Sequence, residues 1–259
     1  MEIVLSERNP LLKQVRRAVQ KGSLTDDGFA VAEGFHLLEE ALKSNADIGA
    51  VIVSQSVKSA IQSHVKGLKM RVLTVRDPDF AALASTETPQ RVVTLVRPPA
   101  WTLDQLLRGR ALVAVLDGIQ DPGNAGAILR AAEAFGATGA AFLKGSVSPY
   151  NPKCMRASAG SVFRLPIAAA LDESLLVAAL GKKRGVLYAA MPHADVLVSD
   201  ANFKTSCAIV IGSEGRGVSE RLAELAKPLR IPTTGVESLN AAVAAGILFY
   251  EARRQRNAS

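Results

Sequence analysis

Hydrophobic residues follow two alternating patterns in the first part of the chain. Apolar runs of strand length occur at 29–32, 48–53, 71–75 and 90–96. Between them, apolar residues recur with the spacing of amphipathic helices, at 37–42, 57–65 and 77–84. Strands that alternate with helices predict a compact α/β domain of about one hundred residues.

The first predicted helix spans residues 9–19. Asn9 stands at its N-cap position, and Lys13, Arg16 and Arg17 share its polar face. This basic face is either an ordinary solvated surface or a contact for RNA phosphates, and both interpretations stay open.

Residues 97–101, Arg-Pro-Pro-Ala-Trp, break both patterns. We therefore predict a first domain over residues 1–97, a linker over 98–110 and a second domain over 111–259.

The second domain opens with an uninterrupted apolar run at 111–117, which is typical of a strand inside a parallel sheet. A turn at 121–126, a helix at 127–135 and a strand at 138–143 complete one strand–helix–strand unit. Residues 159–166 are predicted as a tight turn that leads into a short extended segment. Further strands are predicted at 185–190, 208–211 and 229–231, with helices at 153–158, 173–180 and 221–227.

The closing helix is predicted over residues 239–254. It is apolar almost all round between Ala241 and Tyr250, so we expect it to be buried on more than one side, as in the seam of a dimer. The basic tail at 253–256 is expected to be solvated.

Lysine and arginine number 31 against 24 aspartates and glutamates, which gives a net charge of +7. Residues 98–259 hold 18 of the basic and 13 of the acidic side chains, so most of the excess lies there. A basic surface attracts polyanions because their counterions are released on binding. Charge alone does not establish a nucleic-acid partner.

Cysteine usage and the N-terminal sequence indicate the cellular setting. Cys154 and Cys207 lack the paired spacing of a zinc site, so we interpret them as reduced structural thiols. The three histidines are scattered, and no metal site is predicted. No signal-like apolar segment follows Met1, so we expect a cytoplasmic protein without membrane association.

A first polar cluster, residues 121–130, follows the first strand of the second domain. Parallel α/β sheets place ligands at the carboxyl ends of their strands, and a helix N-terminus there can receive an anion. Asn124 is expected near that N-terminus, and Arg130 lies on the otherwise apolar helix. A buried Arg130 needs a partner. The partner is either Glu214 or Glu133 in a structural ion pair or, as we favour, a substrate phosphate or reacting group.

A second cluster, the sequence GSEGRG at 212–217, follows the strand at 208–211. Its glycines let the backbone approach a flat ligand, although a plain turn is the simple alternative. The order does not match the dinucleotide fingerprint G-x-G-x-x-G, and no acidic residue follows at a strand end about twenty residues later. Both departures disfavour a nucleotide-binding Rossmann enzyme.

A third cluster, residues 231–240, precedes the closing helix. Glu237 or Ser238 could simply cap that helix. Asn240 is followed by alanines and a valine, and a buried amide left without a hydrogen bond costs about 1–3 kcal/mol. We therefore expect Asn240 to bond a fixed loop or a ligand.

Together, residues 116–130, 211–217 and 231–240 resemble the three motifs of the SpoU (TrmH-like) RNA ribose 2′-O-methyltransferases, part of the SPOUT superfamily. Residues 158–166 also resemble a segment typical of the family. Less specifically, residues 9–13 and 32–37 resemble its N-terminal substrate-binding domain.

The resemblance implies an α/β fold in which a C-terminal methyltransferase domain carries a deep trefoil knot and a smaller N-terminal α/β domain binds substrate. Topology rules alone would reject the knot. It also implies a homodimer through the knotted domain and S-adenosylmethionine as cofactor. The implied cofactor-binding residues are Gly212, Ser213, Glu214, Gly217, Ile231, Ser238, Leu239 and Asn240. The implied catalytic residues are Arg130, Asn124, Glu214, Ser238 and Asn240.

The implied activity is methyl transfer to a ribose 2′-hydroxyl of structured RNA, without a metal. In the family, the arginine that matches Arg130 is held to activate that hydroxyl. A guanidinium stays protonated in proteins, so Arg130 is either the base or an orienting group held by a substrate phosphate.

Candidate RNA contacts are Lys13, Arg16, Arg17 and Arg130. Ribosomal RNA is favoured because transfer-RNA relatives more often lack an N-terminal domain of this size. The alternatives are a tRNA 2′-O-methyltransferase and a non-catalytic RNA-binding relative.

Overall fold

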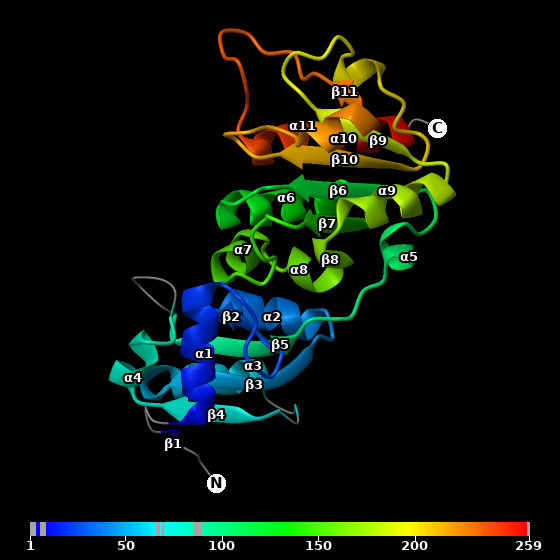
Figure 1. Cartoon of the computed structure of the whole chain (residues 1–259). Coiled ribbons are helices and arrows are strands. Elements are labelled where there is room, and N and C mark those ends of the chain that lie inside the picture. Colours follow the sequence, from blue (N-terminus) through cyan, green and yellow to red (C-terminus); the bar gives the residue numbers. More distant parts are fainter. Residues whose placement is uncertain (1–3, 6–8, 66–67, 69, 85–89, 258–259) are drawn as a thin grey trace. The chain divides into compact units, whose positions relative to one another are not determined.

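The computed structural model describes residues 4–5, 9–65, 68, 70–84 and 90–257. The chain divides into two compact units (Figure 1). The first comprises residues 1–100 and 150–164, and the second comprises residues 101–149 and 165–259. Residues 150–164, which lie inside the second domain of the sequence-based division, thus group with the first unit.

A mixed five-stranded sheet forms the centre of the first unit, in the order β1-β4-β3-β5-β2. Strand β4 runs parallel to β1 and β3, whereas β5 runs antiparallel to β2 and β3. The strands are β1 (Val4–Leu5), β2 (Ala30–Glu33), β3 (Asp47–Ser54), β4 (Val72–Val75) and β5 (Val92–Arg97). The helices of residues 1–100 are α1 (Pro10–Lys21), α2 (Phe35–Lys43), η1 (Gln55–Val57), α3 (Lys58–Val65) and α4 (Asp77–Ala81).

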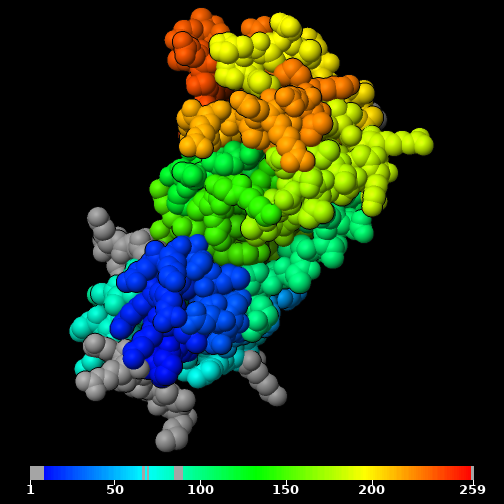
Figure 2. Space-filling model, in the orientation of Figure 1, coloured from blue at the N-terminus to red at the C-terminus, as the bar shows by residue number. Residues whose placement is uncertain are grey.

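Helix α1 confirms the prediction made from its start signals. The side chain of Asn9 accepts a hydrogen bond from an amide of the first turn, Pro10 is the first helical residue, and Gly22 ends the helix with a φ of 62°. Leu12 and Val15 are buried in the core of the unit. The opposite face of α1, blue in Figure 2, lies at the surface.

The segment 150–164 is attached to the first unit by ion pairs. Nη1 of Arg156, in α7 (Pro152–Ala157), lies 3.1 Å from Oε2 of Glu33, whose side chain is only 4% exposed. Arg164, at the end of α8 (Ser161–Arg164), pairs with Glu40 at 2.5 Å. The prediction of a turn and an extended segment at 159–166 was therefore wrong, because residues 161–164 form a helix.

A six-stranded, entirely parallel sheet forms the centre of the second unit, in the order β11-β9-β10-β6-β7-β8. Its strands are β6 (Leu112–Asp117), β7 (Gly139–Leu143), β8 (Ile167–Leu171), β9 (Val186–Ala190), β10 (Cys207–Gly212) and β11 (Lys227–Leu229). Its helices are α5 (Leu103–Leu106), α6 (Pro122–Ala134), α9 (Glu173–Lys182), η2 (Val198–Asp200), α10 (Glu220–Leu225) and α11 (Ala241–Asn257). The buried β6 and its parallel neighbours confirm the predicted parallel α/β sheet.

Several elements of the second unit differ from the prediction. Helix α5 lies inside the predicted linker 98–110, and β11 ends at Leu229, where the predicted strand begins. Strand β8 was missed, because only Ile167 of its five residues is buried and the strand lies at the edge of the sheet. Helix α6 begins at Pro122 rather than at residue 127. Oδ1 of Asp121 accepts a hydrogen bond from the amide of Asn124 at 2.7 Å, so the Asp-Pro pair is an N-cap followed by N1 and not a turn.

Helix α11 packs with one face on β10 and α6, and that face includes Ala245 and Leu248. Val243, Ile247 and Tyr250 are exposed along the other side. Burial on more than one side is therefore not observed within this chain.

The C-terminal end of α11 confirms the prediction of a solvated tail only in part, because Arg253 and Arg254 are exposed but the two residues after them are not. Gln255 is buried, and Arg256 donates hydrogen bonds of 2.8 Å to the carbonyl oxygens of Phe203, Thr205, Arg110 and Ala111. The end of α11 is thereby fastened to the chain that leads into β6 and β10.

Candidate active site

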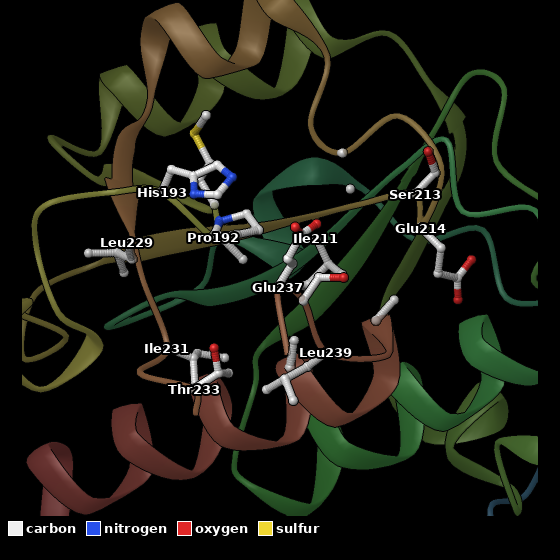
Figure 3. A pocket seen from close by; sticks show the side chains of 17 residues that line it. Pro192, His193, Ile211, Ser213, Glu214, Leu229, Ile231, Thr233, Glu237 and Leu239 are labelled. Carbon is white, nitrogen blue, oxygen red and sulfur yellow. The ribbon is translucent and has the colours of Figure 1, made fainter. Parts of the chain in front are cut away.

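A pocket of about 320 Å³ opens at the carboxyl ends of β9, β10 and β11 (Figure 3). This is the edge at which parallel sheets bind ligands. Figure 3 shows Ser213 and Glu214 on one side of the pocket and Leu229 on the other. The pocket is lined by residues 190–193, residues 211–214, Gly217, Leu229, Ile231, Thr233, residues 237–239, Ala241 and Ala244.

The loop after β10 is a closed turn. The amide of Ser213 donates to the carbonyl of Gly217 at 3.1 Å, and the amide of Gly217 donates back to Ser213 at 2.8 Å. A Cβ at Gly212 would lie 2.1 Å from the carbonyl carbon of Gly217, so a side chain there would displace the turn. Gly212 is therefore required for the shape of this wall of the pocket.

The loop is also fixed from β6. Oδ2 of Asp117, the last residue of β6, accepts a hydrogen bond of 2.7 Å from the amide of Ser219, which precedes α10. The end of β6 thus holds the far end of the loop that begins at Gly212.

Asn240 is the residue that caps α11. Its Oδ1 accepts hydrogen bonds from the amides of Ala242 at 3.0 Å and Val243 at 3.3 Å. Glu237 and Ser238 line the pocket instead of capping the helix. The expected hydrogen bond to a fixed partner is present, but the expected burial is not, because Asn240 is exposed.

Three side chains from the three predicted motifs form one hydrogen-bonded chain. Nδ2 of Asn240 donates to Oδ1 of Asn124 at 3.0 Å, and Nδ2 of Asn124 donates to Oε1 of Glu214. The side-chain amide of Asn124 therefore accepts a hydrogen bond from Asn240 and donates one to Glu214. These hydrogen bonds join the loop after β10, the first turn of α6 and the start of α11.

Arg130 lies on α6 about two turns from Asn124 and is exposed, so the expectation of a buried arginine was wrong. Among the described residues, it makes neither the ion pair with Glu214 nor that with Glu133, and no other hydrogen bond. Arg130 does not line the pocket. Its guanidinium is available to a ligand outside the pocket.

The basic residues of α1 lie apart from this site in the sequence and belong to the first unit. Lys13 and Arg17 are exposed, and Nη1 of Arg17 pairs with Asp26 at 2.8 Å. Arg16 is only partly exposed.

All the residues expected to bind the cofactor line the pocket except Asn240, which borders it through α11. The sequence interpretation missed the contribution of the end of β9 and the residues that follow it, 190–193, which include His193. It also missed Thr233 and Ala244. The end of β9 could have been found, since the predicted strand at 185–190 ends at the edge where ligands bind.

Among the described residues, no group of three or more histidine, cysteine, aspartate or glutamate side chains could hold a metal ion. Within the same part of the chain, no helix has the length and apolar character needed to cross a membrane.

The sequence profile of the SpoU rRNA Methylase family matches residues 111–250, and that of the MRM3-like substrate binding domain matches residues 9–94. RlmP of Bacillus subtilis, a 23S rRNA (guanosine(2553)-2′-O)-methyltransferase, is 30% identical over 265 residues. The match covers 98% of this chain and 100% of RlmP.

Solved structures agree with this match over both units. The SpoU methyltransferase AviRb from Streptomyces viridochromogenes, in complex with AdoMet, has a TM-score of 0.87 at 27% identity and covers 97% of this chain and 100% of its own. The AdoMet-bound rRNA methyltransferase from Sinorhizobium meliloti has a TM-score of 0.83 at 29% identity and covers 98% and 97%.

The fold and the site therefore define an RNA methyltransferase with an N-terminal substrate-binding domain. The chain belongs to the SpoU family of RNA ribose 2′-O-methyltransferases, as its three motifs predicted, and S-adenosylmethionine is its cofactor.

The residues of the pocket fit this cofactor. A volume of about 320 Å³ lies within the range of pockets that hold ligands of this size. Ile211, Leu229 and Leu239 are apolar lining residues of the kind against which a base packs, and Gly212 lets the turn that closes at Gly217 form beside them. Glu214 and Glu237 are acidic, and neither lysine nor arginine is among the described residues that line the pocket, which suits a cationic sulfonium.

Proposed function

We propose that this protein transfers a methyl group from S-adenosylmethionine to a ribose 2′-hydroxyl of ribosomal RNA. The observation that carries the proposal is the hydrogen-bonded chain from Glu214 through Asn124 to Asn240. It fixes the wall of the pocket to the helix that presents Arg130. The cofactor half and the substrate half of the reaction are thereby held in one geometry, which is the main requirement of an in-line transfer.

The pocket residues form the cofactor half in this proposal. Bound S-adenosylmethionine supplies an electrophilic methyl group on a sulfonium. Gly212, Ser213 and Gly217 hold it from one side through the closed turn. Ile231, Ser238 and Leu239 hold it from the other, and Asn240 fixes the start of α11 beneath them.

Arg130 forms the substrate half. Its guanidinium is exposed and unpaired among the described residues, and such a group binds a phosphate through two parallel hydrogen bonds. A guanidinium keeps its proton in proteins. We therefore propose that Arg130 holds an RNA phosphate and orients the neighbouring 2′-hydroxyl, while Glu214 is the side chain of this cluster that can accept a proton.

The first unit supports ribosomal RNA over transfer RNA. It matches a substrate-binding domain, and a relative that covers both units methylates 23S rRNA. We propose that the exposed face of α1, with Lys13, Arg16 and Arg17, contacts RNA phosphates.

We propose that the protein acts as a homodimer in the cytoplasm. Val243, Ile247 and Tyr250 recur at helical spacing and expose an apolar stripe on α11. Burying such a stripe against a second copy is favourable, because it removes apolar surface from water.

We also propose that the second unit is knotted. The chain leaves β10, reaches β11 beyond β9, and returns past the end of β10 along residues 231–239 before α11 packs on β10 and α6. A knot of this kind requires the segment 231–239 to pass through the loop that follows β10, and the course of the chain past the end of β10 supports such a passage.

Transfer of labelled methyl groups to unmodified transcripts tests the proposal. We expect label in 23S rRNA fragments and not in transfer RNA. After alkaline hydrolysis we expect the label in dinucleotides, because a 2′-O-methyl group blocks hydrolysis of the adjacent phosphodiester. Label on a base would contradict the reaction. Label in transfer RNA alone would favour a tRNA 2′-O-methyltransferase.

A further inference from the structure

The amino ends of the strands in the second unit carry exposed cations. In Figure 1, the arrowheads of β6 and β10 point to one side of this unit, and α5 lies toward the other. The exposed cations at this other edge are Arg108, Arg110, Lys182, Lys183, Arg184 and Lys204, here named the amino-edge cluster.

Strand register brings these residues together although they come from three parts of the sequence. Cys207 aligns with both Leu112 and Val186, so β9, β10 and β6 start level with one another. Adjacent strands lie about 4.8 Å apart. The residues that precede the three strands, and hence the cations on them, therefore form one row along the edge.

Hydrogen bonds fix the backbone of this row. The carbonyl of Ser206 accepts from the amide of Val186, and its hydroxyl accepts from the amide of Ala111 at 3.1 Å. Arg256 donates to the carbonyls of Arg110, Ala111 and Thr205 at 2.8 Å each. The backbone that carries the cluster is therefore held in place by hydrogen bonds.

Counter-charges on these elements are few. Among the described residues, no cation of the cluster makes an ion pair. The nearby carboxylates in sequence are Asp104 in α5 and Asp200 in η2, while Glu251 is held by Arg254 and Gln255. Burial lowers the pKa of Arg256, and the like charge of Arg110 adds to this lowering. An ordered row of uncompensated cations of this kind attracts a polyanion.

We infer that the amino-edge cluster is a second RNA-binding surface, which holds phosphates of the substrate at the edge opposite to the cofactor pocket. The inference rests on the proposed function for the identity of the polyanion. Phosphate contacts position an RNA without reading its bases. The surface would therefore contribute to affinity and placement and leave the chemical step unchanged.

The test is a variant with Arg108→Gln, Lys182→Gln, Lys183→Gln and Lys204→Gln. It spares Arg110, which bonds to Arg256, and Arg184, which has a φ of 52°. Binding to a 23S rRNA transcript is measured by fluorescence anisotropy at several salt concentrations. We expect the salt dependence, as the slope of log K against log[salt], to fall by about 3, and affinity to fall at least about tenfold.

The matched control removes the same charge elsewhere, through Lys43→Gln, Arg71→Gln, Lys144→Gln and Arg221→Gln, all exposed. We expect a change in RNA affinity of less than about threefold, since no compact phosphate row is lost. An equal loss in both variants would overturn the inference, because only net charge would then matter. A change in oligomeric mass of the cluster variant would overturn it too, since the edge would then be an interface between copies.

Methyl transfer separates this inference from the proposed function. With saturating RNA, we expect the cluster variant to keep the wild-type kcat and to show only a higher KM for RNA. If the wild-type protein binds RNA through the cluster but transfers no methyl group to it, the proposed function fails and this surface stands. If transfer occurs and the salt slope is unchanged, the surface fails and the proposed function stands.

Discussion

The Nδ2 of Asn240 donates a hydrogen bond to Oδ1 of Asn124 across 116 residues of sequence. The same Asn240 caps α11 through its Oδ1, and the same Asn124 donates to Glu214. Asn240 therefore both caps α11 and links it to α6. A substitution at Asn240 can remove the link and keep the cap.

Asn240→Asp keeps the acceptor that caps α11 and removes the donor to Asn124. A carboxylate at a helix N-terminus is favourable, so we expect the free energy of unfolding to stay within about 0.5 kcal/mol of wild type. Asn124 cannot compensate by rotating its amide, because its oxygen would then face Glu214. We expect methyl transfer to fall about 10²-fold, since the two halves of the site lose their fixed geometry.

Asn240→Ala is the comparison for this variant. It removes the cap as well, and we expect a further loss of about 1 kcal/mol of stability in urea unfolding. Wild-type transfer by Asn240→Asp would show that the link to Asn124 has no part in the reaction.

Gly212→Ala should weaken cofactor binding. The added Cβ would lie 2.1 Å from the carbonyl carbon of Gly217, so the closed turn that lines the pocket has to move. We expect calorimetry to show at least a tenfold weaker Kd for S-adenosylmethionine, about 1.4 kcal/mol. Gly215→Ala in the same loop is the control, because a Cβ there meets nothing within 4 Å. Equal affinities of the two variants would argue against this turn as a wall of the cofactor site.

Glu33→Gln should destabilise the first unit. The Glu33 carboxylate is nearly buried and pairs with Arg156, whose side chain is 28% exposed. Fully buried pairs cost about 3–5 kcal/mol to break, and the partial exposure of Arg156 reduces our expectation to about 2 kcal/mol. Asp26→Asn breaks the exposed pair with Arg17 and should cost less than about 1 kcal/mol. Denaturant unfolding of both variants measures the difference, and equal costs would mean that Glu33 does not hold the segment 150–164.

Cys207 should make stability fall at alkaline pH. Burial raises the pKa of its thiol to about 11, above the ordinary value of about 8.5. Between these values the unfolded chain loses the proton before the folded protein does, so stability is fully present below about pH 8.5 and is lost as pH rises toward 11. Cys207→Ala removes this component, while lysine and tyrosine titrations are common to both proteins. Urea unfolding from pH 8 to pH 10.5 should show a stability difference that narrows with pH, and a constant difference would contradict the account.

Most elements of the fold could be predicted from local sequence. Buried strands such as β6 and β10 are uninterrupted apolar runs, and α1 carries its own start and stop residues. Local sequence patterns failed to predict elements whose position depends on burial at a sheet edge or on contacts distant in the sequence. Edge strand β8 has little apolar surface, and the segment 150–164 joins the first unit through partners more than a hundred residues away, Glu33 and Glu40.

The candidate site was predictable to a similar extent. The residue types of its three motifs and their position at strand ends predicted most of the pocket lining. Exposure could not be predicted for Arg130, because the apolar residues around it on α6 face β6, α11 and the core while its own position faces solvent. Sequence neighbours describe a helix, but its orientation on the sheet decides which of them is buried.

The division of the site between a cofactor pocket and an exposed Arg130 is tested most directly by Arg130→Ala. Two quantities are needed from the same preparation: the Kd for S-adenosylmethionine by calorimetry and the rate of methyl transfer to an unmodified 23S rRNA transcript. Because Arg130 does not line the pocket, we expect a Kd within about twofold of wild type. We expect the rate to fall at least about 10²-fold, since the 2′-hydroxyl is no longer oriented. Transfer at the wild-type rate would contradict the assignment of Arg130 to the substrate half of the site.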